Sequence, residues 1–322
     1  MSVNDASDVS RAKVAVTACG DYETANVERA IERQFSLLSE SINISRGDSV
    51  LLKPNFITPR PSECPAQTHP SVILAVAKAV IELGGKPFVG DSPAWGDITA
   101  CIEALELKEP LEKLGVKVVP LDKPVNQRIA GARVGISKAA LEADKIINLP
   151  KFKAHQQLGA TFAVKNMFGT VAGKEKVYWH FAKGADHHDF CSMLIGIYKL
   201  LGPIVTIIDG IVAMEGQGPV GGEGRNLGLL VGGGDPVACE MVCCEIVKFK
   251  PEELPIVCSA RELGFGCSDI NNIEIVGDDY EPLVCEDFKA SELTALRFSF
   301  FRICKSISKQ LIIMAKYLIN RS

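Results

Sequence analysis

Short, continuously apolar runs alternate with longer amphipathic stretches along most of the chain. The apolar runs predict β-strands at residues 13–19, 49–52, 87–90, 117–121, 145–149, 205–208, 227–231 and 274–276. Apolar residues spaced three to four positions apart predict helices at residues 24–38, 70–83, 188–201 and 236–247. Strands that are apolar throughout and separated by helices are typical of an open, mainly parallel α/β sheet with helices on both faces. We therefore expect such a fold, similar to a Rossmann fold.

The same pattern gives the domain organisation. We expect one α/β domain over residues 13–285, because no repeat, low-complexity stretch or linker interrupts it. Residues 1–12 are polar and lack the apolar segment of a signal peptide, so we expect a disordered N-terminus on a cytoplasmic protein. No run of about 18 apolar residues predicts a membrane-spanning helix.

Residues 286–322 are predicted to form a basic amphipathic C-terminal helix, whose regular pattern runs from 293 to 319. Arg302, Lys305, Lys309 and Lys316 fall on one helical face. All 39 acidic residues lie at or before Glu292, so residues 1–292 carry 29 basic against 39 acidic side chains, a net charge of −10. The six basic residues that follow suit an anionic membrane surface, a partner protein or the chain's own acidic domain. Peripheral attachment to a membrane is therefore compatible with the cytoplasmic expectation.

Composition narrows the function classes. The 322 residues are 47% hydrophobic and 23% charged, with a net charge of −4. These values are typical of a globular enzyme or ligand-binding protein and argue against a nucleic-acid partner. Eleven cysteines occur without any CxxC pair, which indicates free thiols in a reducing compartment rather than a ferredoxin-type cluster.

Charged residues follow several of the predicted strands. Ligands of open α/β sheets bind outside the carboxyl ends of the strands, so we expect one site there. Five consecutive strand exits are predicted to reach this edge, and they carry Lys53 and Asn55, Asp91, Lys151 with Lys153 and His155, Asp209, and Asp235. An aspartate after a strand is also a common turn or capping residue, but five charged exits favour a site over capping alone.

The stretch 152–186 interrupts the strand–helix alternation and is predicted to be a long functional loop. It contains Lys165, Asn166, Gly169 and His180. Lys165 follows Val164 in an apolar run, where a lysine must be paired or bind an anion. A solvated basic loop is the alternative.

A glycine-rich segment, residues 209–224, follows the strand that ends near Asp209. Its spacing is neither GxGxxG nor that of a P-loop, so it is not a dinucleotide or nucleoside-triphosphate fingerprint. We expect a flexible loop, including Gly216, that brings Glu215 towards the same edge. Asp209 and Glu215 would then bind a divalent metal or act as an acid–base pair, unless the segment is only a structural turn.

Two further residues are candidate metal ligands. Cys64 lies in the loop PSECPAQTHP, near His69 at the start of the helix predicted at residues 70–83. A thiolate and an imidazole suit a transition metal, but His69 is also placed to cap that helix.

Seven ordered segments resemble the domain-of-unknown-function 362 family: VLLKPNF, THPSVILAVAKAVIELGG, FVGDSP, INLPKFKAH, TFAVKNMFGTVAGKEK, IIDGIVAMEGQGPVGG and LLVGGGDPVACE. The resemblance covers roughly residues 13–285. Relatives are often described as iron–sulfur proteins with an appended ferredoxin-like domain, which implies redox chemistry. This sequence has no cluster motif and ends instead in the basic segment.

The sequence is consistent with three functions. The first is an enzyme acting on an anionic small molecule, with His155, Asp91, Asp209 and Glu215 as proton-transferring or metal-binding groups. Its ligand-binding residues are expected to be Lys53, Asn55, Lys151, Lys153, Lys165, Asn166, Gly169, His180 and Gly216. The second is a redox protein that receives electrons from the iron–sulfur cluster of a ferredoxin-like partner. The third is a non-catalytic assembly component that docks through its C-terminal helix.

Overall fold

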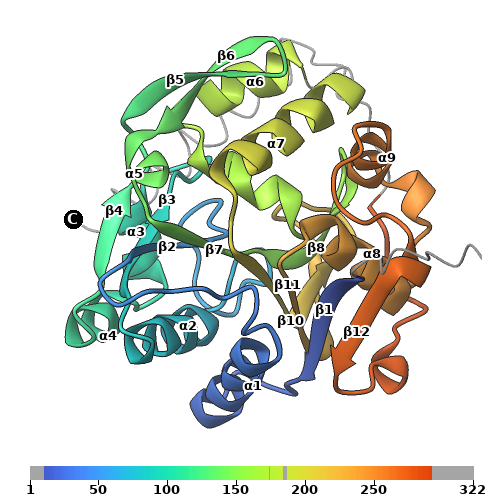
Figure 1. Ribbon diagram of the computed structural model, residues 1–322, viewed down its shortest axis with the longest axis horizontal. Coiled ribbons are helices and arrows are strands. Elements are labelled where there is room, and N and C mark those ends of the chain that lie inside the picture. Colours follow the sequence, from blue (N-terminus) through green and yellow to red (C-terminus); the bar gives the residue numbers. More distant parts are fainter. Residues whose placement is uncertain (1–10, 174, 184–186, 292–322) are drawn as a thin grey trace, which may run out of the picture.

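A ten-stranded mixed sheet runs through the protein, whose computed structural model describes residues 11–173, 175–183 and 187–291 (Figure 1). Along the main path the strands are β12 (Ile273–Gly277), β1 (Ala12–Ala18), β11 (Glu223–Gly233), β10 (Val205–Glu215), β7 (Lys145–Leu149), β2 (Ser49–Pro54), β3 (Lys86–Asp91) and β4 (Lys117–Pro120). All neighbours on this path are parallel except β11, which pairs antiparallel with both β1 and β10. The expected mainly parallel α/β fold is confirmed.

Apolar side chains leave both faces of the sheet, which explains the continuous apolar runs in the sequence. In β2, Val50 and Leu52 pack on one face, while Leu51 packs on the other. The first face is covered by α1 (Thr24–Leu37), α2 (Pro70–Glu82), α3 (Ile98–Ala104) and α4 (Lys108–Lys113). The second is covered by α5 (Lys138–Leu141), α7 (His187–Leu201), α8 (Pro236–Val247) and α9 (Pro255–Glu262).

Each predicted strand is present to within a few residues, but the sequence reading missed a separate hairpin. It consists of β5 (Pro124–Ile129) and β6 (Ala132–Ser137). The two turn residues, Ala130 and Gly131, both have positive φ, as the type I′ turn of a two-residue hairpin requires. The polar, largely exposed β5 gave no apolar run from which a strand could be predicted.

The prediction of a long loop over residues 152–186 was wrong for the described part of that stretch. It contains β8 (Lys151–His155), β9 (Gly159–Thr161), the 3-10 helix η1 (Val164–Thr170) and α6 (Glu175–Ala182). β8 joins the sheet by pairing parallel with β10 and antiparallel with β9. Every residue of β8 and β9 is buried, so the backbone groups need these strand partners.

The glycine-rich segment was also expected to be a loop from residue 209 onward, whereas β10 continues to Glu215 and β11 starts at Glu223. A bulge between Gly210 and Val212 lets the pairing continue. Because β11 runs antiparallel, its end lies at the opposite edge of the sheet from Asp209. Asp235 therefore does not join the predicted site; it caps α8 by accepting hydrogen bonds from the backbone of Val237 and Ala238.

Both predicted terminal segments fall largely outside the described residues, which leave out 1–10 and 292–322. β1 begins at Ala12, inside the segment expected to be disordered. Residues 286–291 form a turn and irregular backbone, so the C-terminal helix does not start at 286 as predicted. Within the described ranges, no helix has the length and hydropathy needed to cross a bilayer.

Candidate functional site: a buried lysine cluster

Two buried ion pairs stand at the carboxyl ends of neighbouring strands. Lys53 near the end of β2 pairs with Asp91 at the end of β3, with 2.8 Å between Nζ and Oδ1. Lys151 at the start of β8 pairs with Asp209 in β10, with 2.8 Å between Nζ and Oδ2. Both pairs are almost fully shielded from solvent. The parallel strands thus bring these four predicted residues to one edge.

The Asp91 carboxylate has three hydrogen-bond donors around it. Besides Lys53, it accepts hydrogen bonds from the backbone N–H groups of Phe56, at 2.8 Å, and Ser92, at 2.7 Å. Lys53 also donates to the Pro54 carbonyl at 2.6 Å. Charged groups are tolerated inside a protein when they are paired and hydrogen-bonded in this way.

Asp209 is similarly occupied. Its carboxylate accepts hydrogen bonds from the Tyr22 hydroxyl, at 2.8 Å, and the His69 backbone N–H, at 3.0 Å. Lys151 donates in turn to the Tyr22 oxygen, at 2.6 Å. The rings of Tyr22 and His69 stack with their centroids 3.6 Å apart, and His69 Nδ1 accepts from the Ser71 N–H. His69 thus caps α2, the alternative that the sequence left open.

An amide network joins the third lysine to the first pair. Lys153 donates to the side-chain oxygen of Asn55 and, at 3.0 Å, to the Ala66 carbonyl. Asn55 donates to Asn166 at 2.8 Å, and Asn166 donates to the Lys53 carbonyl at 2.9 Å. The residues predicted from separate motifs therefore form one connected cluster.

Two more lysines complete it. Lys176 in α6, which was not among the expected ligand-binding residues, donates to the carbonyls of Ser92 and Gly169. Lys165 in η1 is partly buried and makes no hydrogen bond or ion pair within the described part of the chain. We call Lys53, Lys151, Lys153, Lys165 and Lys176, together with Asp91 and Asp209, the lysine cluster. Its five lysines exceed its two carboxylates by three.

Burial and mutual repulsion disfavour the charged form of these lysines. Burial lowers the pKa of Lys165 to about 8. Burial lowers the pKa of Lys176 to about 7; Asp91 opposes this shift, whereas Lys53 and Lys165 add to it. The pKa of Lys153 lies well below its usual value because of burial and the nearby charges of Lys165 and Lys151. A bound anion would favour the charged form of all three lysines and so raise their pKa values.

Gly169 touches the cluster from η1. A Cβ atom at this position would overlap Lys53 Nζ and Asp91 Oδ1, so a side chain there would displace the ion pair. The start of η1 is held by Glu240 of α8, whose Oε1 accepts from the backbone N–H groups of Ala163 and Val164, both at 3.0 Å. Glu240, which sequence reasoning missed, therefore fixes the segment that carries Lys165, Asn166 and Gly169.

The Glu215 side chain is held by groups outside the lysine cluster as defined above. Glu215 ends β10, one residue after Met214, which is the register partner of Lys153 in β8. It binds Arg225 and Lys289, and Gly216 follows it at a positive φ. Burial raises the pKa of Glu215, but hydrogen bonds from the Lys289 backbone and Arg225, with their charges, bring it below its usual value.

Three further candidates are placed as follows. His155 ends β8, is buried, and accepts the Gln157 N–H at Nδ1. Cys64 is a partly exposed free thiol in the loop before α2. The side chain of His180 lies outside the described residues. Among the residues that the structure does describe, no three histidine, cysteine or acidic side chains are arranged to hold a metal ion.

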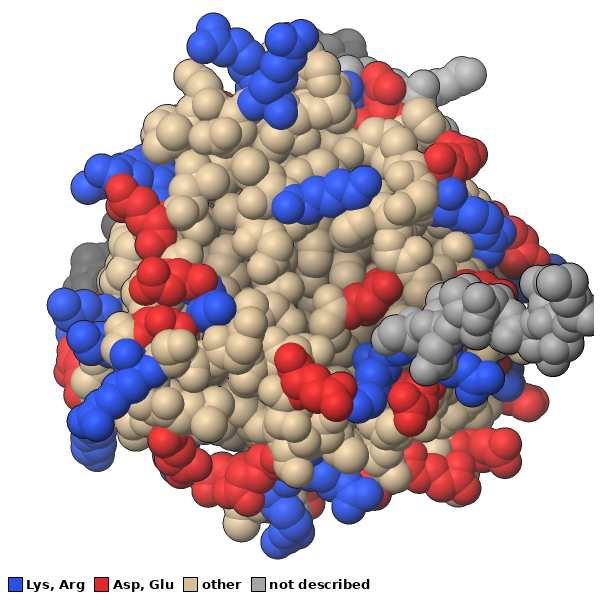
Figure 2. Space-filling view, in the orientation of Figure 1, with Lys and Arg blue, Asp and Glu red and all other residues tan. Residues whose placement is uncertain are grey.

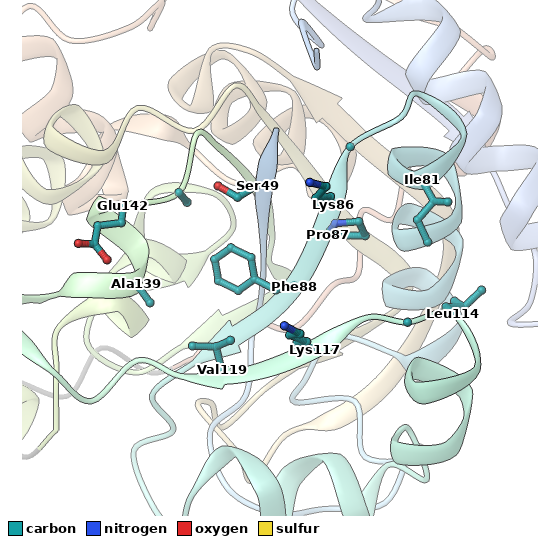
Figure 3. Close-up of a pocket in the computed structure, with 13 residues that line it drawn as sticks. Ser49, Ile81, Lys86, Pro87, Phe88, Leu114, Lys117, Val119, Ala139 and Glu142 are labelled. Atoms are coloured by element: carbon teal, nitrogen blue, oxygen red, sulfur yellow. The ribbon is translucent and has the colours of Figure 1, made fainter. Parts of the chain in front are cut away.

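Two cavities of the described chain lie away from the lysine cluster. One of about 550 Å³ opens at the amino ends of β2, β3 and β4, where the Phe88 ring stands among Ser49, Lys117 and Val119 (Figure 3). Another of about 520 Å³ lies between the start of β11 and residues 282–287. Lys165 is the partly exposed member of the cluster, and the neighbouring Asn55 and Gly169 are partly exposed as well.

The surface gives no competing charged site on the face shown in Figure 2. Most lysine, arginine, aspartate and glutamate side chains lie around the rim of this face, with both signs mixed, and the centre is largely uncharged.

Comparisons with known proteins extend over most of the chain. The model of a domain of unknown function, DUF362, matches residues 50–245. A thylakoid-associated protein of Synechocystis sp. is 36% identical over 300 residues, which cover 92% of this chain and 93% of the relative. The lactate racemase apoprotein from Thermoanaerobacterium thermosaccharolyticum is 13% identical with a TM-score of 0.44, over 75% of this chain and 58% of the racemase. The matched residues 50–245 include all seven members of the lysine cluster.

Proposed function

The chain belongs to the DUF362 family, and we propose that it is an enzyme that binds a multiply charged small anion at the lysine cluster. The observation that carries this proposal is the excess of three lysines over carboxylates in a buried, hydrogen-bonded site. Burying the charged form of these lysines without a counter-charge is costly, which is why their pKa values are lowered. A ligand with two or more negative charges would balance them.

The residues divide into two roles under this proposal. Asp91 and Asp209 hold Lys53 and Lys151 in place, because each carboxylate is filled by its lysine and backbone donors. Lys153, Lys165 and Lys176 provide the charge for the anion, and the partly exposed Asn55 and Gly169 lie beside them. Phosphates and dicarboxylates fit this donor set, since lysine binds both as a point charge.

Binding by the purified full-length protein tests the proposal. We expect isothermal titration calorimetry to detect binding of inorganic phosphate, pyrophosphate or succinate, weakened by about tenfold or more in Lys165→Met. Lys117→Met, an exposed lysine at the opposite edge, is the matched control and should bind as the wild type does. Equal affinities for Lys165→Met and wild type, or no binding of any of these anions, would refute an anion site here.

We also propose peripheral membrane attachment through residues 293–322. The relative from Synechocystis is described as thylakoid-associated, and its similarity covers 92% of this chain. The six basic residues after Glu292 and the apolar residues between them suit the surface of an anionic membrane. This attachment is separate from the lysine cluster and would place that site near a membrane without altering its chemistry.

A further inference from the structure

Lys165 differs from the other lysines of the cluster because it makes no hydrogen bond or ion pair with another described residue. It lies in η1 between the buried residues Val164 and Asn166, and its amine has no partner among the described residues. The other four lysines each donate to a carboxylate, a carbonyl or an amide oxygen. Lys165 is partly exposed, so its amine can meet a ligand that arrives from solvent.

The alternative reactive groups of the cluster are already occupied. Asp91 accepts from Lys53 and two backbone N–H groups, and Asp209 accepts from Lys151, Tyr22 and two backbone N–H groups. His69 Nδ1 accepts the Ser71 N–H, and burial lowers the pKa of this imidazole to about 4. None of these groups can attack or deprotonate a ligand without losing a bond that holds the site.

The surroundings of Lys165 are those of a nucleophilic amine. Burial lowers its pKa to about 8, so a substantial fraction is neutral at physiological pH. A lysine activated by burial or by neighbouring cations is the amine that enzymes use to attack carbonyl carbons. Lys165 precedes Asn166, which is bonded to Asn55, the residue that accepts from Lys153. The charge of Lys165 also lowers the pKa values of Lys153 and Lys176, so an anionic group of the same ligand would be bound by these neighbouring lysines.

We propose that Lys165 forms an imine with the carbonyl carbon of an oxo acid held by the lysine cluster. The inference rests on the proposed anion site and names its substrate class: a small molecule carrying both a negative charge and a ketone or aldehyde. The neutral amine attacks the carbonyl carbon and forms the C–N bond. The carbonyl oxygen then takes the two amine protons and leaves as water, so no oxidant or reductant is needed.

Borohydride trapping of the full-length protein tests the inference. The protein is incubated with glyoxylate, pyruvate or 2-oxoglutarate, reduced with sodium borohydride and mapped by peptide mass spectrometry. We expect a stable secondary amine on Lys165, with a yield that rises as the pH passes through about 8. Glutarate, which lacks the carbonyl, should protect Lys165 from 2-oxoglutarate without being trapped.

Variants separate the outcomes. Lys165→Met and Lys165→Arg should abolish trapping, while Lys117→Met should leave it unchanged; Lys165→Arg keeps the charge if Lys165→Met fails to fold. Glutarate binding without trapping of any oxo acid would overturn the imine and leave the anion site standing. Labelling of Lys153, Lys176 or exposed lysines to the same extent as Lys165 would also overturn the assignment. Absence of binding by both glutarate and 2-oxoglutarate would instead count against the anion site itself.

Discussion

Three lysines of the cluster, Lys53, Lys151 and Lys153, are at most 3% exposed, yet only two carboxylates lie beside them. Replacing a buried ion pair by apolar residues of similar volume is often neutral or stabilising, so stability alone does not require such residues. The proposed anion binding would account for these lysines at the carboxyl edge of a parallel sheet. Glu240 is another buried ionisable group.

Glu240 makes a pH-dependent contribution to stability. Burial raises its pKa to about 7 from the ordinary 4.5 of a glutamic acid, against the opposing hydrogen bonds from Val164 and Ala163. Its Oε2 has no partner in the described structure. Between these two values the folded state therefore binds more protons than the unfolded state. The free energy of unfolding falls as the pH rises through this window.

We predict that Glu240→Gln removes this fall. Glutamine keeps an oxygen for the two backbone N–H groups and carries no charge. Urea unfolding at pH 5 and pH 8 should show the variant gaining stability relative to wild type by up to roughly 3 kcal/mol at the higher pH, since one pKa unit is worth about 1.4 kcal/mol. Parallel pH profiles for the two proteins would contradict the assignment.

At the scale of elements, the apolar strands and their charged exits were predictable, but the direction of a strand was not. Asp235 follows an apolar run just as Asp91 does, yet β11 is antiparallel and carries it to the other edge. An apolar run contains no information about direction, because either direction buries the same side chains. The sheet order depends on long-range pairing that local patterns do not specify.

The sequence of β8 shows a local pattern from which a strand could have been predicted. Its residues alternate as Lys151, Phe152, Lys153, Ala154 and His155, which is the period-two pattern of a strand with one polar and one apolar side. That alternation places Lys151 and Lys153 on the same side of the strand. Lys176 had no comparable signal, because its position depends on how α6 folds over Ser92 and Gly169.

The contact between η1 and the first ion pair gives a prediction at this scale. Gly169→Ala should push η1 away from Lys53 and Asp91, because the added Cβ has no room. We expect a loss of roughly 1–3 kcal/mol in urea unfolding, together with weaker anion binding. Gly20→Ala is the matched control, since no atom lies within 4 Å of its added Cβ. If the two alanine variants unfold alike, the close packing described for Gly169 is not present in solution.

For the whole molecule, charge is divided between the α/β domain and the segment after Glu292. Residues 1–292 carry a net charge of −10 and the rest of the chain +6. A negatively charged domain is repelled by an anionic membrane, so the proposed attachment is assigned to the basic segment. Screening by salt should weaken such attachment.

We predict that the full-length protein sediments with vesicles containing anionic lipid at low salt, and that a variant lacking residues 293–322 does not. Vesicles of neutral lipid are the control, and raising the ionic strength should release much of the bound protein. The truncated variant should keep its thermal midpoint. A truncated variant that stays in solution but unfolds at a lower temperature would show that the segment packs on its own domain instead.

Proton uptake on anion binding measures whether the excess lysines of the cluster bind a negatively charged ligand. Lys165 and Lys176, with pKa values of about 8 and 7, are partly neutral at pH 8, and a bound anion favours their protonated forms. Calorimetric titration of wild-type protein with pyrophosphate at pH 8, in buffers of different ionisation enthalpy, measures the protons exchanged. We expect net proton uptake that diminishes in Lys165→Met and persists in Lys117→Met. Binding without proton uptake, or with the same uptake in Lys165→Met, would contradict this expectation.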